Sequence, residues 1–346
     1  MSAGTKRILL RADGGPVLGL GHVMRCRSLA LELRRLGWDP LFYGTVDPPP
    51  GPLVDETGHP LPRVPVDQGW GDDPGRGSDT LRVAREWRVQ AVVVDAYEFR
   101  YEDFRVLTEA GFPVIAIDDL GNRELPVDMV VNPNPLVTPG MYKCQNIPSV
   151  LTGEMFTLIR PEVLALPRAG GRREDGAVLV TLGGGDVADL MRQVLHAIPG
   201  DLDPPVVASV SPACPRSLLQ IWAQTAPSHR ALNHDPAMLP DLMSQAGLAV
   251  TSGGTTLWEL YYLGVPGIVL AGVANQKQTT TVIRKRQTSL LLDIQAGFRP
   301  DPFREALHRL LTEPELSERM IERQHALIDG QGARRVAEAI DLRYER

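Results

Sequence analysis

Residues 248–271 read LAVTSGGTTLWELYYLGVPGIVLA, and this stretch decides the fold. It starts with the apolar run Leu248–Thr251, turns through glycines and continues as a helical pattern over Thr255–Leu263. Gly264 follows as a helix stop, and Val265–Ala271 is a second apolar run. Continuous apolar runs of this length are typical of parallel strands that are buried on both faces. The stretch therefore predicts a strand–helix–strand unit of a parallel sheet.

The same plan recurs along the rest of the chain. Further strands are expected at Ile8–Arg11, Ala91–Asp95, Pro113–Asp118, Met129–Asn132 and Ala177–Thr181. Further helices are expected over 22–36, 101–110, 188–197 and 331–346. Strands that alternate with helices indicate an α/β chain with doubly wound parallel sheets. Because the plan occurs twice, we expect two Rossmann-like domains that face each other across a cleft.

The length of 346 residues suits two domains of ordinary size. We expect an N-terminal catalytic domain over 1–165 and a nucleotide-binding domain over 177–330. Residues 166–176 are rich in Arg and Gly without an apolar period, which favours a linker. The last segment, 331–346, reads as a helix that can pack back on the N-terminal domain.

Composition excludes several classes of function. The 36 basic and 42 acidic side chains give a net charge of −6, so binding to nucleic acid through bulk positive charge is not expected. Three scattered cysteines and scattered histidines predict neither a disulfide framework nor a metal site. No apolar run reaches the length of a membrane span, which is about 18–20 residues. We therefore expect a cytoplasmic protein without metal, cofactor or membrane insertion, and leave its oligomeric state open.

The first glycine loop, 14–22, delivers His22 to the start of a helix. It is not a dinucleotide fingerprint, because Met24 stands where the third glycine belongs. Free amides and the positive helix end disfavour an imidazolium there, and a neutral imidazole suits a general base. The plainer interpretation is that His22 only fills a helix start. Arg11 and Asp13, which end the preceding strand, either orient substrate hydroxyls or pair with each other.

Two further glycine loops join strands to helices in the second half of the chain. Amides and hydroxyls at such turns suit a diphosphate, although any strand–helix turn can use glycine. A carboxylate one turn into the second helix can accept hydrogen bonds from a ribose diol, but an acidic residue is favourable there in any case. The residues expected to contact a nucleotide are Gly183, Gly184, Ser252, Gly253, Gly254, Thr255, Glu259, Asn275 and Gln276.

Several motifs, taken in order, resemble one known family. They are RADGGPVLGLGHVMRC at 11–26, DDLGNR at 118–123, VVNPNP at 130–135, LTGEMFTLIRPEV at 151–163, LVTLGGGD at 179–186 and TSGGTTLWELYYLGVPGIVLAGVANQ at 251–276. Together they resemble the PseG/SpsG-like UDP-sugar hydrolases, relatives of the MurG-type GT-B glycosyltransferases. The resemblance implies a GT-B-like fold and a UDP-sugar as the substrate.

The resemblance also implies a reaction and roles for residues. The family member in pseudaminic acid synthesis releases UDP from UDP-2,4-diacetamido-2,4,6-trideoxy-β-L-altropyranose with inversion at C1. His22 matches the family's catalytic histidine, Asp13 and Asn132 match sugar-side positions, and 252–254 with Glu259 match the nucleotide-binding stretch. The full set assigned to the sugar side is Arg11, Asp13, Gly19, Gly21, Asp95, Asp118 and Asn132.

Two other functions remain open at this point. A GT-B transferase uses the same nucleotide half, with an acceptor hydroxyl in place of water. A non-catalytic protein would bind the nucleotide sugar and release nothing. Asp95, Asp118 and Asp119 follow strand ends of the first half, where they either assist the base and bind the sugar or cap turns.

Overall fold

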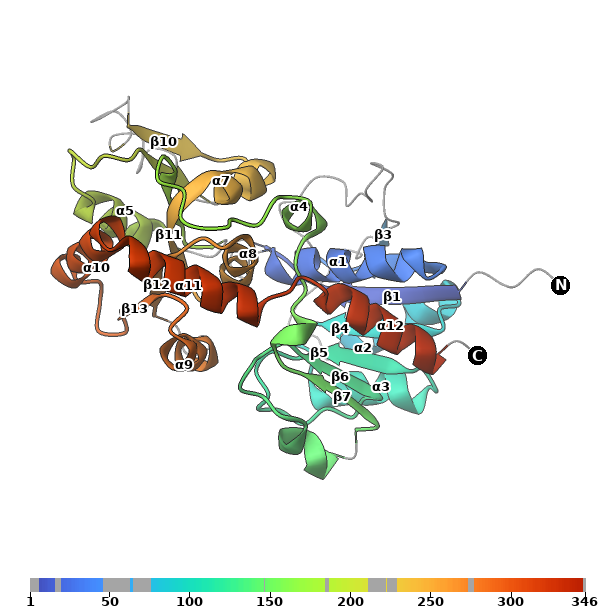
Figure 1. Cartoon of the computed structure of the whole chain (residues 1–346). Coiled ribbons are helices and arrows are strands. Elements are labelled where there is room, and N and C mark those ends of the chain that lie inside the picture. The colour runs from blue at the N-terminus through green and yellow to red at the C-terminus, as the bar shows by residue number, and fades with distance from the viewer. Residues whose placement is uncertain are drawn as a thin grey trace. The chain divides into compact units, whose positions relative to one another are not determined.

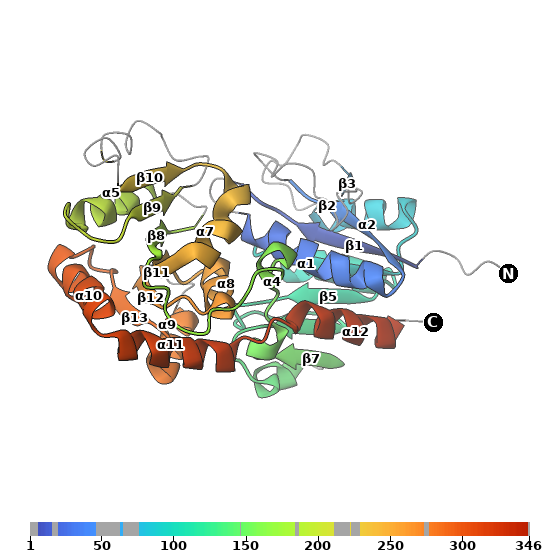
Figure 2. The same cartoon turned by 45° about the horizontal axis from the view of Figure 1, so that its top comes forward.

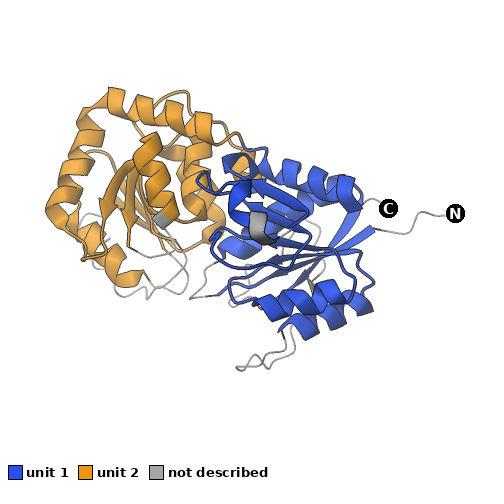
Figure 3. Cartoon of the chain, turned by 90° about the horizontal axis from the view of Figure 1, so that it is seen from below, with its two compact units in different colours: residues 1–160, 330–346 blue, residues 161–329 orange. Residues whose placement is uncertain are grey.

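The computed structural model describes residues 6–15, 20–45, 63–64, 76–145, 147–183, 187–210, 222, 229–272 and 277–344. The chain forms two compact units, which Figure 3 colours separately. Unit 1 comprises Met1–Arg160 together with Gly330–Arg346, and unit 2 comprises Pro161–Asp329. The C-terminal segment therefore returns to the unit in which the chain begins.

Unit 1 is built on a seven-stranded sheet with the strand order β3-β2-β1-β4-β5-β6-β7, in which every pair is parallel. The strands are β1 (Lys6–Ala12), β2 (Trp38–Tyr43), β3 (Arg63–Val64), β4 (Ala91–Asp95), β5 (Val114–Ile117), β6 (Met129–Asn132) and β7 (Ser149–Thr152). The helices are α1 (Gly21–Arg35), α2 (Arg76–Glu86), α3 (Tyr101–Glu109) and α12 (Gly332–Tyr344), with 3-10 turns η1 (Pro139–Gln145) and η2 (Glu154–Phe156).

Both faces of this sheet are covered, which explains its unbroken apolar strands. Along β1, Ile8 and Leu10 pack into one core and Leu9 into the other, because successive side chains of a strand point to opposite faces. The first core includes residues of α1 and α12, and the second includes residues of α2 and α3. The doubly wound architecture expected from the sequence is confirmed.

The C-terminal helix α12 packs beside α1 (Figures 1 and 2). Val336, Ala337 and Ile340 of α12 are buried in the same core as Leu29 and Leu33 of α1. Helix α12 thereby covers part of the sheet face on which α1 lies.

Unit 2 repeats the plan with six parallel strands in the order β10-β9-β8-β11-β12-β13. The strands are β8 (Ala177–Thr181), β9 (Val206–Ser209), β10 (Arg230–Asn233), β11 (Ala246–Ser252), β12 (Gly267–Ala271) and β13 (Leu290–Asp293). The helices are α4 (Pro161–Leu164), α5 (Ala188–Ala197), α7 (Leu239–Gln245), α8 (Thr255–Leu263), α9 (Lys277–Arg286), α10 (Pro300–Thr312) and α11 (Pro314–Leu327), with the 3-10 turn η3 (Pro236–Met238).

The segment 166–176, which the sequence assigned to a linker, lies within unit 2 and packs on it. The Arg168 guanidinium donates to the carbonyls of Tyr262 and Ile328, and the Arg172 guanidinium donates to the carbonyl of Leu310. These carbonyls lie at or near the ends of helices, where the last carbonyls need donors. Two of the arginines on which the linker prediction was based therefore donate to carbonyls at helix ends.

Gly264, which the sequence predicts as the stop of the helix over Thr255–Leu263, ends that helix in the structure. Gly264 follows α8 with φ 74°, the left-handed conformation that favours glycine at this position.

Among the helices of the described residues, none has both the length and the apolar composition that a membrane crossing requires.

Candidate active site

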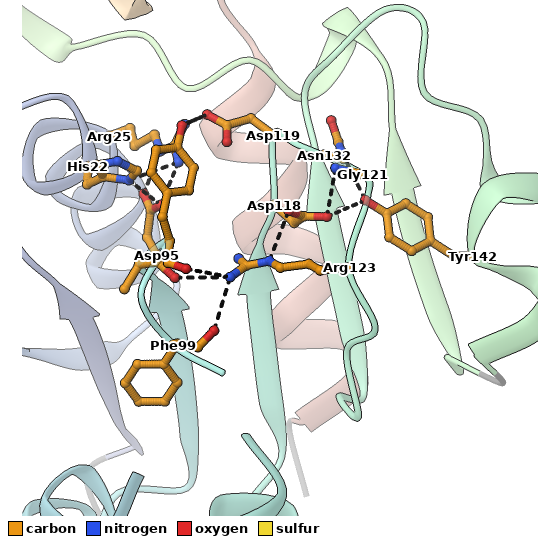
Figure 4. A network of polar contacts seen from close by, with 12 residues as sticks. His22, Arg25, Asp95, Phe99, Asp118, Asp119, Gly121, Arg123, Asn132 and Tyr142 are labelled. Atoms are coloured by element: carbon orange, nitrogen blue, oxygen red, sulfur yellow. Dashed lines mark hydrogen bonds and ion pairs between the residues drawn. The ribbon is translucent and has the colours of Figure 1, made fainter. Parts of the chain in front are cut away.

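His22 lies at the carboxyl edge of the unit 1 sheet. It is the second residue of α1, which follows the interior strand β1, and it is buried. Strand β4 pairs with β1 and ends at Asp95. The His22 Nδ1 atom lies 2.7 Å from Asp95 Oδ1 (Figure 4). Strand order therefore brings together two residues that are 73 positions apart in sequence.

This contact decides the tautomer of a neutral His22 ring, although Arg25 Nη2 also lies 3.1 Å from His22 Nδ1. A guanidinium only donates, and Nη2 already donates to Asp95 Oδ1, which is the nearer neighbour of His22 Nδ1. A carboxylate oxygen only accepts hydrogen bonds, so the nitrogen that faces it must carry the proton. With Nδ1 donating to Asp95, the lone pair of the neutral ring lies on Nε2. The ring is thereby oriented with Nε2 as its basic atom, as in a histidine–aspartate pair of a general-base site.

One guanidinium holds Asp95 in its ionised form. Arg25, one turn further along α1, donates through Nε and Nη2 to the two oxygens of the Asp95 carboxylate. Burial alone would raise the pKa of Asp95, but the Arg25 and His22 charges outweigh burial and place that pKa well below its usual range. Asp95 therefore remains a carboxylate throughout the neutral pH range. The same guanidinium donates from Nη1 to Asp119 Oδ2 over 2.8 Å.

Tyr97 closes this group of residues into a ring of contacts. Its aromatic ring stands edge-on to the His22 ring, with centroids 4.6 Å apart, and its hydroxyl donates to Asp119 Oδ2 over 3.0 Å. Burial and the Asp119 charge raise the pKa of Tyr97, so its hydroxyl keeps the donated proton. His22, Arg25, Asp95, Tyr97 and Asp119 form a group that we call the His22 cluster.

A second polar network lies along the same edge and is buried more deeply (Figure 4). Asp118, after β5, accepts hydrogen bonds from the Tyr142 hydroxyl over 2.7 Å and from the Gly121 amide over 3.1 Å, and pairs with Arg123. The Asn132 amide group, at the end of β6, donates to the Tyr142 hydroxyl. The structure thus places the two predicted sugar ligands Asp118 and Asn132 in contacts with other side chains, with no exposed surface.

Other residues assigned to the sugar side occupy the β1–α1 connection. Arg11 is fully buried, and its guanidinium pairs with Asp13 over 2.7 Å, so the ion-pair alternative is confirmed. Asp13 also accepts a hydrogen bond from the Thr45 amide. Gly21 is the first residue of α1, and Gly19 lies outside the described residues.

Several of the predicted nucleotide residues that the structure describes lie at the carboxyl edge of the unit 2 sheet. Gly183 follows β8 with φ 93°, and Ser252 ends the neighbouring strand β11, where its hydroxyl donates to the carbonyl of Leu182. Gly254 precedes α8, and no side chain of the described residues caps that helix start. Gly253 and Thr255 flank Gly254, while Glu259 is buried in the second turn of α8. Gly184, Asn275 and Gln276 lie outside the described residues.

Among the described residues, no group of three or more histidine, cysteine or acidic side chains has an arrangement that could hold a metal ion.

Sequence reasoning missed Arg25, Tyr97, Arg123 and Tyr142. For Arg25 a signal existed, because a residue three positions after His22 on a helix lies on the same face. The two tyrosines and Arg123 carry no comparable signal, since Tyr97 and Arg123 lie in loops and Tyr142 lies in the 3-10 turn η1.

The fold defines the class of protein: the chain has the GT-B fold. MurG of Acinetobacter baumannii matches with a TM-score of 0.66, 15% identity and coverage of 97% of this chain and 99% of that chain. MnaA of Staphylococcus aureus, in a structure with UDP, matches with a TM-score of 0.69, 14% identity and coverage of 98% and 97%.

The resemblance to SpsG-like proteins holds over nearly the whole chain. The spore coat polysaccharide biosynthesis protein SpsG of Bacillus subtilis is 24% identical over 348 residues, which covers 96% of this chain and 97% of that protein. No protein-family model matches the chain.

Proposed function

We propose that this protein is a nucleotide-sugar hydrolase that releases UDP from a UDP-activated amino sugar. The substrate class is that of UDP-2,4-diacetamido-2,4,6-trideoxy-β-L-altropyranose. Water attacks C1 from the face opposite the diphosphate, so the anomeric configuration inverts. The bond between water oxygen and C1 forms as the bond between C1 and the diphosphate oxygen breaks.

His22 is the general base of this reaction. Its Nε2 atom accepts the proton of the attacking water, and the Asp95 carboxylate stabilises the imidazolium that forms. Arg25 keeps Asp95 ionised and in place, so the ring does not reorient during proton transfer. UDP leaves as an anion, and the proton on Nε2 then passes to solvent.

The diphosphate contacts are assigned to unit 2. The amides at the start of α8 and the Gly183 turn present donors where negative charge develops on the leaving group. Preorganised donors of this kind are each worth about 3–4 kcal/mol in related reactions. Since a diphosphate is already a good leaving group, one base suffices where ordinary glycosidases use two carboxylates.

The single observation that carries the proposal is the contact between His22 Nδ1 and Asp95 Oδ1, which makes Nε2 the basic atom. The likeness to SpsG supports a role in polysaccharide biosynthesis, and the UDP in the MnaA structure supports a uridine nucleotide.

The test is the release of free nucleotide in the absence of any acceptor. The protein is incubated with a panel of UDP-, CMP- and GDP-activated amino sugars that includes the diacetamido altropyranose. We expect rapid release of UDP from one UDP-sugar and formation of the free sugar with inverted configuration. Absence of release from every member of the panel contradicts the proposal.

A transferase is the second candidate, because the fold matches MurG over nearly the whole chain. In that case His22 deprotonates a sugar or lipid hydroxyl in place of water. The same assay separates the two functions: a hydrolase releases UDP without an acceptor, whereas a transferase releases UDP at a comparable rate only after an acceptor is added. A binding protein releases none under either condition.

A further inference from the structure

Two neighbouring carboxylates after β5 have opposite surroundings. Asp118 is fully buried and both of its oxygens are engaged, Oδ2 by Tyr142 and Gly121 and Oδ1 by Arg123. The side chain of Asp119, in contrast, is 27% exposed.

Only one oxygen of Asp119 is engaged. Its Oδ2 atom accepts from Arg25 and Tyr97, whereas Oδ1 accepts no hydrogen bond from any of the described residues, although it exposes almost no surface. A carboxylate oxygen that is shielded from water without a donor is costly and rare in native proteins. Such an atom indicates a place that a ligand donor completes.

We propose that Asp119 recognises the sugar by accepting a hydrogen bond at Oδ1 from an acetamido N–H or a hydroxyl of the activated sugar. This inference rests on the proposed function and names a specificity-determining residue for it. The ligand of Asp119 must be a donor because an ionised carboxylate only accepts. It is the sugar and not the diphosphate, because two anions repel each other.

The contacts of Asp119 also give it a defined position relative to the base. Arg25 binds Asp95 and Asp119 with one planar guanidinium, and Tyr97 contacts both His22 and Asp119. The acceptor Asp119 and the base His22 are therefore connected through the side chains of Arg25 and Tyr97. A sugar that donates to Oδ1 is oriented with respect to His22 before the reaction, which is the function of a preorganised binding residue.

The experiment compares the affinities for UDP and for UDP-2,4-diacetamido-2,4,6-trideoxy-β-L-altropyranose by calorimetry. A His22→Ala background prevents turnover during the measurement. The contribution of the sugar is the ratio of the affinity for the UDP-sugar to the affinity for UDP. Adding Asp119→Ala is expected to lower this ratio by about tenfold or more, which is the scale of a hydrogen bond to a charged group. The affinity for UDP itself is expected to stay within about twofold, since unit 2 holds the nucleotide.

Two control variants separate recognition from structural damage. Asp39→Asn removes a carboxylate of the same unit that pairs with Arg7, away from the His22 cluster, and is expected to leave the contribution of the sugar unchanged. Tyr97→Phe removes a donor to Oδ2 but leaves Oδ1 intact, and is expected to change that contribution by less than about threefold.

An unchanged sugar contribution in Asp119→Ala overturns the inference, and so does an equal loss of affinity for UDP and the UDP-sugar. The absence of any sugar contribution in the His22→Ala background also overturns it, because Asp119 then has no sugar to bind. If wild-type protein still releases UDP in either case, the proposed function stands and only the role of Asp119 fails.

Discussion

The carboxyl edges of the two sheets have the same topology and different chemistry. In unit 1 the edge carries ionisable side chains that hold one another, among them His22, Arg25 and Asp95. In unit 2 the corresponding edge carries glycines and hydroxyls, among them Gly183 and Ser252. The two edges therefore differ in the groups they present: unit 1 has interacting ionisable side chains, and unit 2 has glycines and hydroxyls.

The largest expected effect on stability comes from breaking the ion pair of unit 1. Asp95→Asn leaves the buried Arg25 charge without its main partner and is expected to lower the free energy of unfolding by about 3–5 kcal/mol. Turnover is expected to fall as well, because an asparagine no longer fixes the His22 tautomer. Denaturant unfolding measures the first effect and UDP release the second.

The exposed pair of Arg7 with Asp39 provides the control, since Asp39→Asn is expected to cost less than about 1 kcal/mol.

The pH dependence of stability provides a second test of the Asp95 ion pair. The pKa of Asp95 in the folded protein lies below its unfolded value of about 3.9. Its stabilisation is therefore present above about pH 4 and is lost as the pH falls through the folded pKa. If the difference in the free energy of unfolding between wild type and Asp95→Asn does not shrink as the pH falls, this account is contradicted.

The next effect concerns the backbone of unit 2. Gly183→Ala forces an L side chain to φ 93°, at a cost of about 1–2 kcal/mol. We expect the affinity for UDP to fall by about tenfold, because the turn must move to relieve the strain. Gly111→Ala introduces comparable strain at φ 84° in unit 1 and is expected to leave UDP binding unchanged. Equal affinities of wild type and Gly183→Ala for UDP would contradict a contact between this turn and the nucleotide.

A smaller effect tests whether Asp118 and Asn132 are structural. Tyr142→Phe removes a hydroxyl that donates to Asp118 and accepts from Asn132, and leaves both groups buried without that partner. The expected loss in the free energy of unfolding is about 1–3 kcal/mol, with KM for the sugar nucleotide unchanged. An increase in KM at unchanged stability would return these residues to the sugar-binding set.

The smallest effect lies in unit 2 at alkaline pH. Burial raises the pKa of Tyr261 to about 12, although the hydrogen bonds between its hydroxyl and the side chains of Ser289 and Thr288 oppose the shift. Because the folded pKa exceeds the unfolded value of about 10, the stabilisation is complete below about pH 10 and is lost between that pH and the folded pKa. Tyr261→Phe is therefore expected to show a flatter loss of stability in this range, measured by urea unfolding. If the free energies of unfolding of wild type and Tyr261→Phe fall in parallel as the pH rises, the raised pKa of Tyr261 is contradicted.

The fold could be predicted well from the sequence because buried parallel strands have a strong local signal. The runs at Ala91–Asp95 and Ala177–Thr181 became β4 and β8 with the expected bounds. The strands β2, β7, β9, β10 and β13 were missed, and three of them, β7, β10 and β13, lie at sheet edges. At β10, for example, Arg230–Asn233 has no buried residue, because an edge strand needs no continuous apolar run.

The candidate site could be predicted only in part, for a physical reason. The positions of His22 and Asp95 at strand ends follow from the parallel sheet, but their direct contact depends on the order of β1 and β4. Whether Asp118 or Asp119 has an oxygen without a donor among the described residues depends on the loop around Tyr97 and on the 3-10 turn that holds Tyr142, which no periodicity encodes. Motifs therefore identified the edge, and the structure separates the fully buried Asp118 from the partly exposed Asp119.

The central claim is that His22 Nε2 is the base. The most direct measurement is single-turnover release of UDP by His22→Ala, alongside calorimetric binding of UDP. The exposed histidine variant His308→Ala is the matched control. The account predicts a rate about 10²–10⁴-fold below that of wild type and of the control, with UDP affinity unchanged. Release of UDP by His22→Ala at the wild-type rate would contradict it.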